Sequence, residues 1–254
     1  MASPTPTPSR LPHAALDLPS RRHKAMKIVR LLGLSERPGV LRILEIGAGA
    51  GGISQWLANA EGGRFEVHAV DVVDSRQVKD GYHFQLIPDS RLPFDNDSFD
   101  IVISNHVIEH VGDDQAQALH LSEFYRVLRK GGLGYLAVPN RWMLVEPHYR
   151  LPLLSWWPES WRSHWLRFWQ GKAPYDCRPL SRAELERRLK ASGLDFEQLH
   201  EEALRVTYEI DQPESKLWRH LLRHLPSSVH VFSRSIYPTL IYRVFHPDRA
   251  PDSD

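Results

Sequence analysis

The chain has 254 residues, 42% of them hydrophobic and 25% charged, which is typical of a globular protein with one large core. Its formal net charge is only +1, so charge does not indicate a polyanionic partner, and we expect no nucleic acid. The single cysteine, Cys177, excludes an internal disulfide. The sequence shows no signal peptide and no apolar run long enough to span a membrane, so we expect a cytoplasmic protein.

The first 140 residues predict an alternation of strands and helices. Residues 1–18 are rich in Pro and Thr and are expected to form a disordered tail, whereas residues 20–34 form a basic amphipathic helix. Apolar runs then predict strands, and 3.6-residue periodicity predicts helices between them. The expected strands are 41–47, 65–73, 82–88, 99–105 and 133–140, and the expected helices are 52–60 and 113–132. Such alternation is typical of parallel βαβ units, which bind ligands beyond the carboxyl ends of their strands.

The regular pattern stops after Asn140. Residues 141–179 are rich in Trp, Pro, Arg and His, and regular structure resumes with a helix that Ser181 and Glu184 begin as a capping box. We expect a sixth strand at 195–204, a short helix within 212–226 and a late strand at 235–245. The predicted organisation is one domain over 19–254, with substrate-side insertions at about 141–179 and 205–230.

A glycine-rich turn follows the first predicted strand. Glycine permits a tight turn and a close approach of backbone to ligand, and the helix after it offers free N–H groups. Both dinucleotides and S-adenosylmethionine are bound by such turns, and the spacing of Gly47, Gly49 and Gly52 fits either. Glu45 favours S-adenosylmethionine, because a carboxylate suits the cationic sulfonium and amino groups better than a pyrophosphate.

Acidic residues follow the next two predicted strands. Asp71 ends the second strand, 24 positions after Gly47, where an acid can accept both ribose hydroxyls. Asp89 follows the third strand and can accept from the adenine amino group, while the Ser90 N–H donates to the ring. The competing interpretations are a solvated acid at the strand end and a plain turn.

These residues, taken in order, resemble the class I S-adenosylmethionine-dependent methyltransferases. The resemblance covers about residues 40–140 and is nearest to the broad bacterial subgroup of small-molecule and ubiquinone-pathway enzymes. It rests on Glu45-x-Gly47-x-Gly49-x-Gly51, Asp71, Asp89-Ser90-x-Leu92-Pro93-Phe94, Ser98-Phe99-Asp100, Glu109-His110 and Arg126-Val127-Leu128-x-x-Gly131-Gly132. Arg91 is a departure, because the family commonly has an acid there.

The resemblance implies a doubly wound, mostly parallel seven-stranded sheet, Rossmann-like, with an aromatic-rich insertion after strand five. It also implies S-adenosyl-L-methionine as cofactor. Transferred onto this chain, the family's cofactor contacts fall on Glu45, Gly47, Ala48, Gly49, Gly51, Asp71, Val72, Asp89, Ser90 and Asn105.

A histidine-rich run, residues 105–110, follows the fourth strand. His106, Glu109 and His110 match the H-x-x-E-H pattern of some zinc peptidases, but a third ligand is lacking and we reject zinc hydrolysis. Three interpretations stay open. His110 can be structural, His106 or His110 can accept a proton from a substrate hydroxyl, or the run can hold a divalent cation as in some quinone-pathway relatives. We expect no metal and keep both histidines as catalytic candidates.

The aromatic insertion is expected to contact the acceptor. Arg141, Trp142, His148 and Tyr149 come just after strand five, at the ligand edge, and are the candidate substrate-binding residues. Five tryptophans lie within 156–169, three of them with i, i+4, i+8 spacing on one helix face, among basic residues. Such a segment can pack on the main domain, cover an apolar acceptor, or contact a membrane surface peripherally.

The combined expectation is a methyltransferase acting on a small or lipid-like acceptor, more often at oxygen. Two alternatives are a nicotinamide-dependent oxidoreductase, which Glu45 opposes, and a non-catalytic methyltransferase-like binding protein, which the intact glycines and Asp71 oppose.

Overall fold

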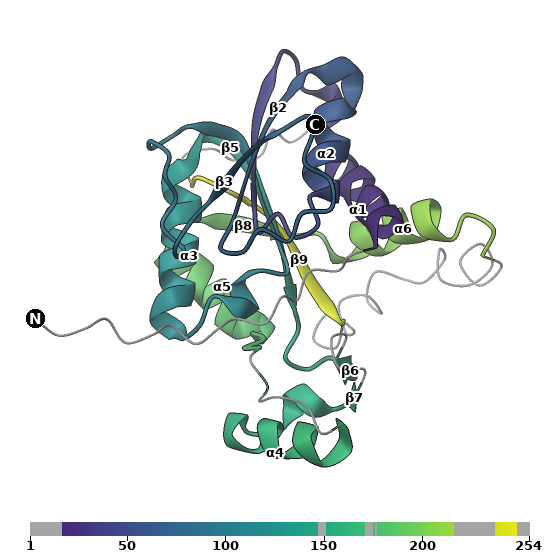
Figure 1. The fold of residues 1–254 in the computed structure, drawn as a ribbon, viewed down its shortest axis with the longest axis vertical. Coiled ribbons are helices and arrows are strands. Elements are labelled where there is room, and N and C mark those ends of the chain that lie inside the picture. Colours follow the sequence, from purple (N-terminus) through teal and green to yellow (C-terminus); the bar gives the residue numbers. More distant parts are fainter. Residues whose placement is uncertain (1–16, 147–150, 171–174, 176, 216–236, 248–254) are drawn as a thin grey trace, which may run out of the picture.

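A seven-stranded sheet forms the centre of the fold in the computed structural model, which describes residues 17–146, 151–170, 175, 177–215 and 237–247 (Figure 1). The strand order is β3-β2-β1-β4-β5-β9-β8. The first five of these strands are parallel, and β9 pairs antiparallel with both β5 and β8. The strands are β1 (Leu41–Ile46), β2 (Phe65–Asp71), β3 (His83–Leu86), β4 (Phe99–Asn105), β5 (Leu128–Pro139), β8 (Asp195–Gln198) and β9 (Thr239–Phe245). The predicted doubly wound, mostly parallel sheet is confirmed.

Helices cover both faces of this sheet, so each face has its own apolar core. On one face lie α1 (Leu18–Leu31), α2 (Gly52–Asn59) and α6 (His200–Asp211), and on the other lie α3 (Asp114–Val127) and α5 (Arg182–Ala191) (Figure 1). Central strands are buried on both sides; in β4, six of the seven residues are buried. This is the burial that a parallel sheet between two helix layers requires.

The order of the strands reverses between β1 and β4. The chain runs outward from β1 through β2 to β3, then returns to the other side of β1 as β4. The loops after β1 and β4 therefore leave in opposite directions, and sheets of this kind bind their ligands at such a point, beyond the carboxyl ends of the strands. The glycine turn and the histidine-rich run follow these two strands.

Two predicted boundaries are wrong. The helix predicted over 113–132 ends at Val127, because Leu128 is already extended and pairs with Phe99 of β4. The backbone carbonyl of Leu128 lies 2.6 Å from the His246 ring nitrogen Nε2, a partner 118 residues away that local propensity does not reveal. The strand predicted over 195–204 ends at Gln198, where its pairing with Tyr242 of β9 stops. The helix α6 begins at His200, because Ala203 and Val206 pack in the core beside α1.

Other expectations agree with the structure or fall outside it. The capping box of α5 is present, with the Ser181 hydroxyl facing the Glu184 N–H and the Glu184 carboxylate accepting from the Ser181 N–H. Of the tail expected over 1–18, residues 1–16 lie outside the described part of the chain. The helix α1 begins at Leu18. Most of the helix expected within 212–226 also lies outside them.

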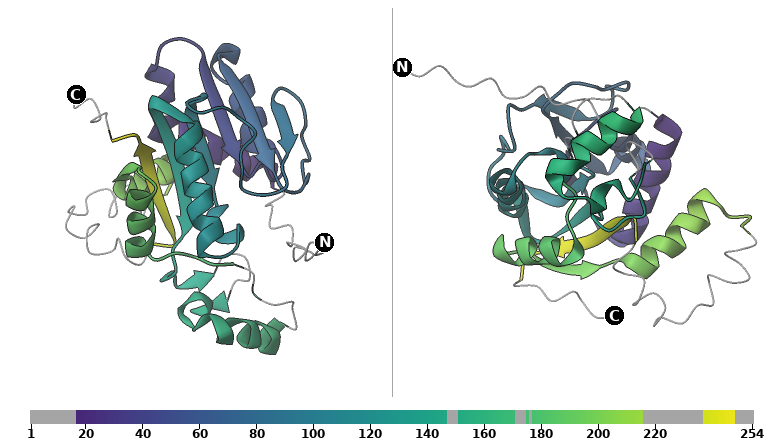
Figure 2. Two further views of the ribbon diagram at one scale, coloured as in Figure 1. Left: turned by 90° about the vertical axis from the view of Figure 1, so that its left-hand side faces the viewer. Right: turned by 90° about the horizontal axis from the view of Figure 1, so that it is seen from below.

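The chain after β5 forms a small protruding unit, which we call the aromatic module (residues 142–146 and 151–170). It contains the two-stranded ladder of β6 (Val145–Glu146) and β7 (Leu151–Pro152), followed by η4 (Leu154–Trp156) and α4 (Glu159–Gln170). Two views place it beyond the carboxyl end of β5, away from the sheet (Figures 1 and 2). The predicted aromatic cluster after strand five is therefore present. No helix of the described residues is long and apolar enough to cross a membrane.

Candidate cofactor and methyl-transfer site

The turn between β1 and α2 depends on glycine backbone geometry. Gly47, Gly49 and Gly51 have φ values of +82°, +51° and +81°, a region that side chains disfavour. The N–H groups of Gly47 and Ala48 both donate to the Val70 carbonyl, at 2.8 and 3.1 Å, which ties the turn to the end of β2. The sequence therefore uses glycine here to fold the chain sharply back over the sheet edge.

The space around this turn also excludes side chains. A Cβ at Gly47 would lie 2.5 Å from Val107 Cγ2, and one at Gly51 would lie 2.5 Å from the Val78 carbonyl. The first turn of α2 has no side-chain cap, so its backbone N–H groups point toward the bend. The backbone of the turn is thus kept bare where a ligand could approach it.

Glu45 lies on β1 beneath the turn and is only 2% exposed. The Ser54 hydroxyl of α2 donates a hydrogen bond to its carboxylate oxygen Oε2. Burial raises the pKa of Glu45 to about 8, although Ser54 and the charge of Arg21 oppose that rise. Near neutral pH Glu45 therefore holds a proton in this structure, and a nearby cation would favour its ionised form.

Asp71 closes the other side of the turn. Its carboxylate accepts from the Gly49 N–H at 2.9 Å and from the Val72 N–H at 2.7 Å. Each carboxylate oxygen has a second lone pair, so Asp71 keeps the capacity to accept two hydroxyl groups. Asp71 therefore links the glycine turn to β2 while remaining half-exposed at the strand end.

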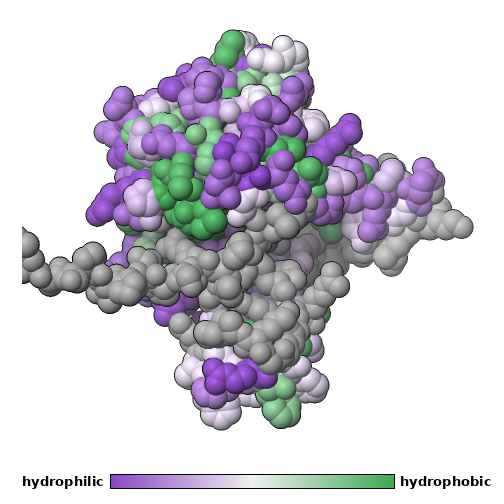
Figure 3. Space-filling view, in the orientation of Figure 1, coloured by the Kyte–Doolittle hydropathy of each residue, from purple (hydrophilic) through white to green (hydrophobic). Residues whose placement is uncertain are grey.

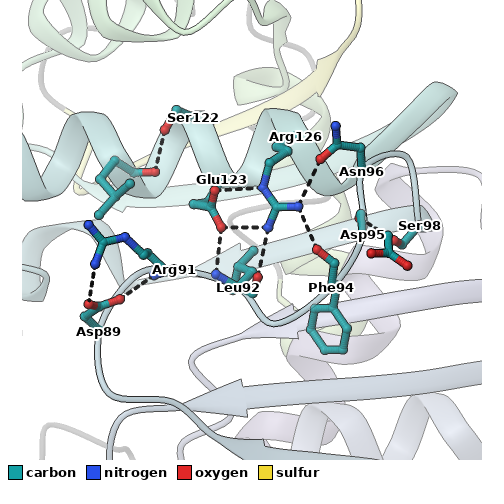
Figure 4. Close-up of polar contacts among 11 residues, drawn as sticks. Asp89, Arg91, Leu92, Phe94, Asp95, Asn96, Ser98, Ser122, Glu123 and Arg126 are labelled. Carbon is teal, nitrogen blue, oxygen red and sulfur yellow. Dashed lines mark hydrogen bonds and ion pairs between the residues drawn. The ribbon is translucent and has the colours of Figure 1, made fainter.

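The loop after β3 carries Asp89 and Ser90 and is anchored to α3. Arg126 donates to the backbone carbonyls of Phe94 and Leu92, at 2.6 and 2.9 Å, and Glu123 accepts from the Leu92 N–H at 2.7 Å (Figure 4). This anchoring explains the position of Arg126 in the sequence pattern. In Figure 4, Asp89 faces Arg91, whose N–H donates to it at 2.7 Å.

Asn105 is the last residue of β4, on the other side of β1, and His106 follows it. The side-chain oxygen of Asn105 is buried and has no donor among the described residues. His106 has φ of +58°, uncommon for a residue with a side chain, and its N–H donates to the Ala137 carbonyl of β5. Such backbone strain is found most often at functional sites. An unpaired acceptor and a strained histidine thus lie side by side at the carboxyl end of β4.

Glu109 is the buried partner of both candidate histidines. It is fully buried, and its Oε1 lies 3.4 Å from His106 Nδ1 and 3.8 Å from His110 Nε2. Burial alone would raise the pKa of Glu109, but the two histidines outweigh it and the pKa is lowered. The ionised carboxylate of Glu109 is thus buried between the two imidazole rings.

The two candidate histidines differ in their surroundings. His106 is half-buried and adjoins Val107, the residue that packs against Gly47. The Nδ1 atom of His110 lies 3.7 Å from the sulfur of Cys177, a buried side chain brought from the segment after the aromatic module. A third histidine, His120, is fully buried; burial lowers its pKa to about 4, and Ser104 contacts it at 3.0 Å.

Strand register brings the predicted cofactor residues to one edge. Ile46 of β1 pairs with Val70 of β2 on one side and with Ser104 of β4 on the other. The residues that come next on the three strands are therefore side by side across the sheet edge. They are Asp71 of β2, Gly47 after β1 and Asn105 of β4. Asp89 and Ser90 come a few residues after β3, whose Leu86 pairs with Asp71. The row that the sequence predicts is continuous in space.

The predicted acceptor residues are only partly described. Arg141 lies 3.8 Å from Glu184 and stacks near the Trp142 ring, with 5.5 Å from its guanidinium carbon to the ring centroid. Trp142 packs edge-on against Trp156 of η4, within the aromatic module. His148 and Tyr149 lie outside the described residues.

Arg21 is a site residue that sequence reasoning missed. A Cβ added at Gly52 would lie only 2.8 Å from the Cβ of Arg21. The helix α1 therefore packs directly over the start of α2. Its charge acts on Glu45. The only signal in the sequence was the basic character of the helix. Among the described residues, no group of three or more acidic, His or Cys side chains could hold a metal ion.

Known proteins are similar to the part of the chain that contains this site. A family model described as a methyltransferase domain matches residues 44–136. A protein named a probable S-adenosylmethionine-dependent methyltransferase in Mycolicibacterium smegmatis is 32% identical over 108 residues, which make up 42% of this chain and 33% of that protein. The ubiquinone/menaquinone biosynthesis C-methyltransferase UbiE of Desulfotalea psychrophila is 28% identical over 101 residues, 37% of this chain and 40% of that protein. The chain thus spans well under half of the length of these relatives.

A solved structure shares the fold. The YcgJ protein of Bacillus subtilis matches with a TM-score of 0.52 and 18% identity, covering 87% of this chain and 98% of that one. The fold of this chain is therefore that of the solved structure. Residues 44–136 match the methyltransferase domain family, and about two fifths of the chain is similar to a probable S-adenosylmethionine-dependent methyltransferase.

Proposed function

We propose that this chain transfers a methyl group from S-adenosylmethionine to a small or lipid-like acceptor, more often at oxygen. The observation that supports it best is the row of Gly47, Asp71 and Asn105 at the carboxyl edge of the sheet, with Glu45 beneath it. This row offers bare backbone, a carboxylate that can accept two hydroxyls and a buried acid that a cation would ionise. Those are the features that a sulfonium compound with a ribose requires.

The residues around the turn suit the two charged groups of a methionine moiety. The N-terminus of α2, with Arg21 packed over it, favours an anion such as the α-carboxylate. Glu45 lies on the strand below and favours the cationic amino and sulfonium groups. Asp71 would hold the ribose, and the Asp89–Ser90 loop, fixed by Arg126, would hold the adenine.

Methyl transfer asks little of protein side chains beyond placement. S-adenosylmethionine supplies an already activated methyl group, so holding the acceptor in line with the methyl–sulfur bond lowers much of the barrier. An alcohol or phenol acceptor must also lose its proton as the new carbon–oxygen bond forms. We assign that proton to His106, because Glu109 would stabilise the imidazolium that results. The name of the UbiE relative makes carbon the rival acceptor atom.

Calorimetry tests the cofactor assignment directly. S-adenosylhomocysteine is expected to bind with a micromolar Kd, whereas NAD is expected to show no measurable heat at the same concentrations. The expectation follows from Glu45, because a cationic amino group near it gains the attraction of an ionised carboxylate, whereas a pyrophosphate gains none. Tighter binding of NAD would replace this proposal with the oxidoreductase alternative. Binding of S-adenosylhomocysteine without label transfer into any fraction of a cell extract would instead support a non-catalytic binding protein.

The acceptor chemistry can be tested once labelled cofactor has identified an active extract fraction. His106→Gln is expected to lower kcat by about 100-fold with little change in the Kd of S-adenosylhomocysteine, since it removes a proton acceptor and no cofactor contact. His110→Gln is the matched comparison, and its effect should be smaller because that ring packs against Cys177. Equal kcat values for His106→Gln and the parent would show that His106 does not accept the proton, and would favour methylation at carbon.

A further inference from the structure

One side of the aromatic module exposes large rings to solvent. On α4, Trp161 is 63% exposed, Phe168 80% and Trp169 58%, while Trp165 is half-buried. The helical spacing places these four side chains on one face. Trp156 and Trp157, just before the helix, are also exposed. We call these six residues the ring face.

Most of the ring face lies outside the face on which α4 packs. The neighbouring side of the helix is buried, with Leu166 against Leu154 of η4, and Trp165 and Tyr175 pack on that contact. Arg162 is also buried there and donates to the backbone carbonyls of Trp157 and Ser155. The module therefore has its own small core on one side. The sequence allowed the tryptophans to pack on the main domain, to cover an acceptor or to contact a membrane. The exposure of the rings does not support the first of these interpretations.

Five of the six rings form a continuous set of ring contacts, whereas Trp156 contacts Trp142 instead. Trp157 lies parallel to Trp161, with centroids 6.2 Å apart, and contacts Trp165 at 5.2 Å. Trp165 contacts Trp169 at 6.0 Å, and Phe168 contacts Trp169 at 5.7 Å. Figure 3 shows the module as a knob below the main body, with pale and green surface beside one purple, hydrophilic patch.

Basic and polar groups flank the ring face on α4. By helical spacing, Ser160, His164 and Arg167 lie along one border of the rings, and all three are exposed. The sequence of α4 has one acidic residue, Glu159 at its first position, and two arginines, Arg162 and Arg167. Rings bordered by arginine and histidine complement an anionic headgroup layer, where Trp and Arg are both favoured.

The area of the ring face argues against a stable second copy of this chain. Taking about 150–250 Å² for a complete aromatic side chain, the exposed fractions of the ring face amount to roughly 400–700 Å². A standard protein interface buries about 800 Å² on each partner. The patch is thus large for a monomer surface but small for a lasting dimer, and a helix lying in a lipid interface needs no larger area.

We propose that the ring face binds the surface of an anionic lipid bilayer, with α4 lying parallel to it. Trp161, Phe168 and Trp169 insert among the headgroups and first acyl carbons, and Arg167 contacts lipid phosphates. The inference does not depend on methyl transfer. If both hold, the carboxyl edge of the sheet, next to the module, faces the membrane and takes acceptors from it.

Sedimentation with vesicles tests the proposal on the full chain. Vesicles of phosphatidylcholine with 30% phosphatidylglycerol (about one anionic lipid in three) should bind the parent protein, and tryptophan emission should shift to shorter wavelength. Trp161→Ser/Phe168→Ser should reduce the partition coefficient at least tenfold. The matched control is Val40→Ser/Leu86→Ser, which removes two exposed apolar side chains from the main body and should leave binding unchanged. Arg167→Gln should weaken vesicle binding and should make that binding less sensitive to salt.

Three outcomes would overturn the proposal. These are no binding of the parent to the anionic vesicles, unchanged binding of the double ring variant, and a parent dimer that the ring variant converts to monomer without any vesicle binding. Each variant is also titrated with S-adenosylhomocysteine. Unchanged affinity shows that the variant is folded, and it separates failure of the membrane surface from failure of the proposed cofactor site.

Discussion

Asp71→Asn is expected to weaken binding of S-adenosylhomocysteine by at least about 100-fold. A carboxylate that accepts two ribose hydroxyls makes two charge-assisted hydrogen bonds, each worth about 1.5–3 kcal/mol, and the amide keeps at most one neutral acceptor. The amide also places a donor opposite the N–H of Gly49 or Val72, both of which now donate to Asp71. Isothermal titration calorimetry measures the change, which should appear as lost affinity without a change in stoichiometry.

The control for this variant is Asp74→Asn. Asp74 lies three residues further on, is exposed, and pairs with Arg76 rather than with the glycine turn. Its pKa is lowered by the Arg76 hydrogen bonds, and its replacement should leave the affinity within about twofold of the parent. Circular dichroism of both variants shows whether the fold is retained. Parent-like affinity in a folded Asp71→Asn protein would contradict the assigned ribose site.

The strand pattern and the glycine turn could be predicted because they depend on local chemistry. Buried parallel strands are nearly continuous apolar runs, as in β4, and the turn needs φ values that only glycine adopts without strain. The same holds for the capping box of Ser181 and Glu184, whose two bonds span three residues. Each of these signals lies within a single short window of sequence.

The features that the sequence did not reveal depend on distant partners. The helix end at Val127 depends on Phe99 and His246, and the placement of Arg21 depends on α1 packing across α2. The sequence also did not show that Glu45 is sealed behind Ser54. An acid next to a glycine turn could equally point to solvent, and only the packing of α2 decides its depth.

Glu45 is expected to make the stability of the cofactor-free protein fall as pH rises from about 5 to 8. In the unfolded chain its pKa is near 4.5, whereas burial raises the folded value to about 8. Between these values the folded state holds a proton that the unfolded state has lost, so the unfolding free energy falls with rising pH and levels off above 8. At about 1.4 kcal/mol for each pKa unit, the loss can approach roughly 4 kcal/mol.

Glu45→Gln removes this titration while keeping an oxygen that can accept from Ser54. Urea unfolding at pH 6 and pH 8.5 should therefore show a smaller fall for the variant than for the parent. The matched control is Glu66→Gln, because Glu66 is exposed on the next strand and its pKa is lowered by His68 and Arg42 rather than raised. An equal pH dependence in the parent and Glu45→Gln would show that Glu45 is already ionised in the empty site.

The same proton links Glu45 to the ligand. A sulfonium and an ammonium group held near Glu45 favour its ionised form, so S-adenosylmethionine should release close to one proton on binding at pH 7 and bind more tightly as pH rises from 6 to 8. Calorimetry in two buffers of different ionisation enthalpy counts that proton, and Glu45→Gln should release none. A ligand that binds by displacing an internal proton can then be recognised by its charge as well as its shape, because a neutral or anionic nucleotide leaves Glu45 protonated. No proton release by the parent protein would mean that the bound cation lies too far from Glu45 to select the ligand.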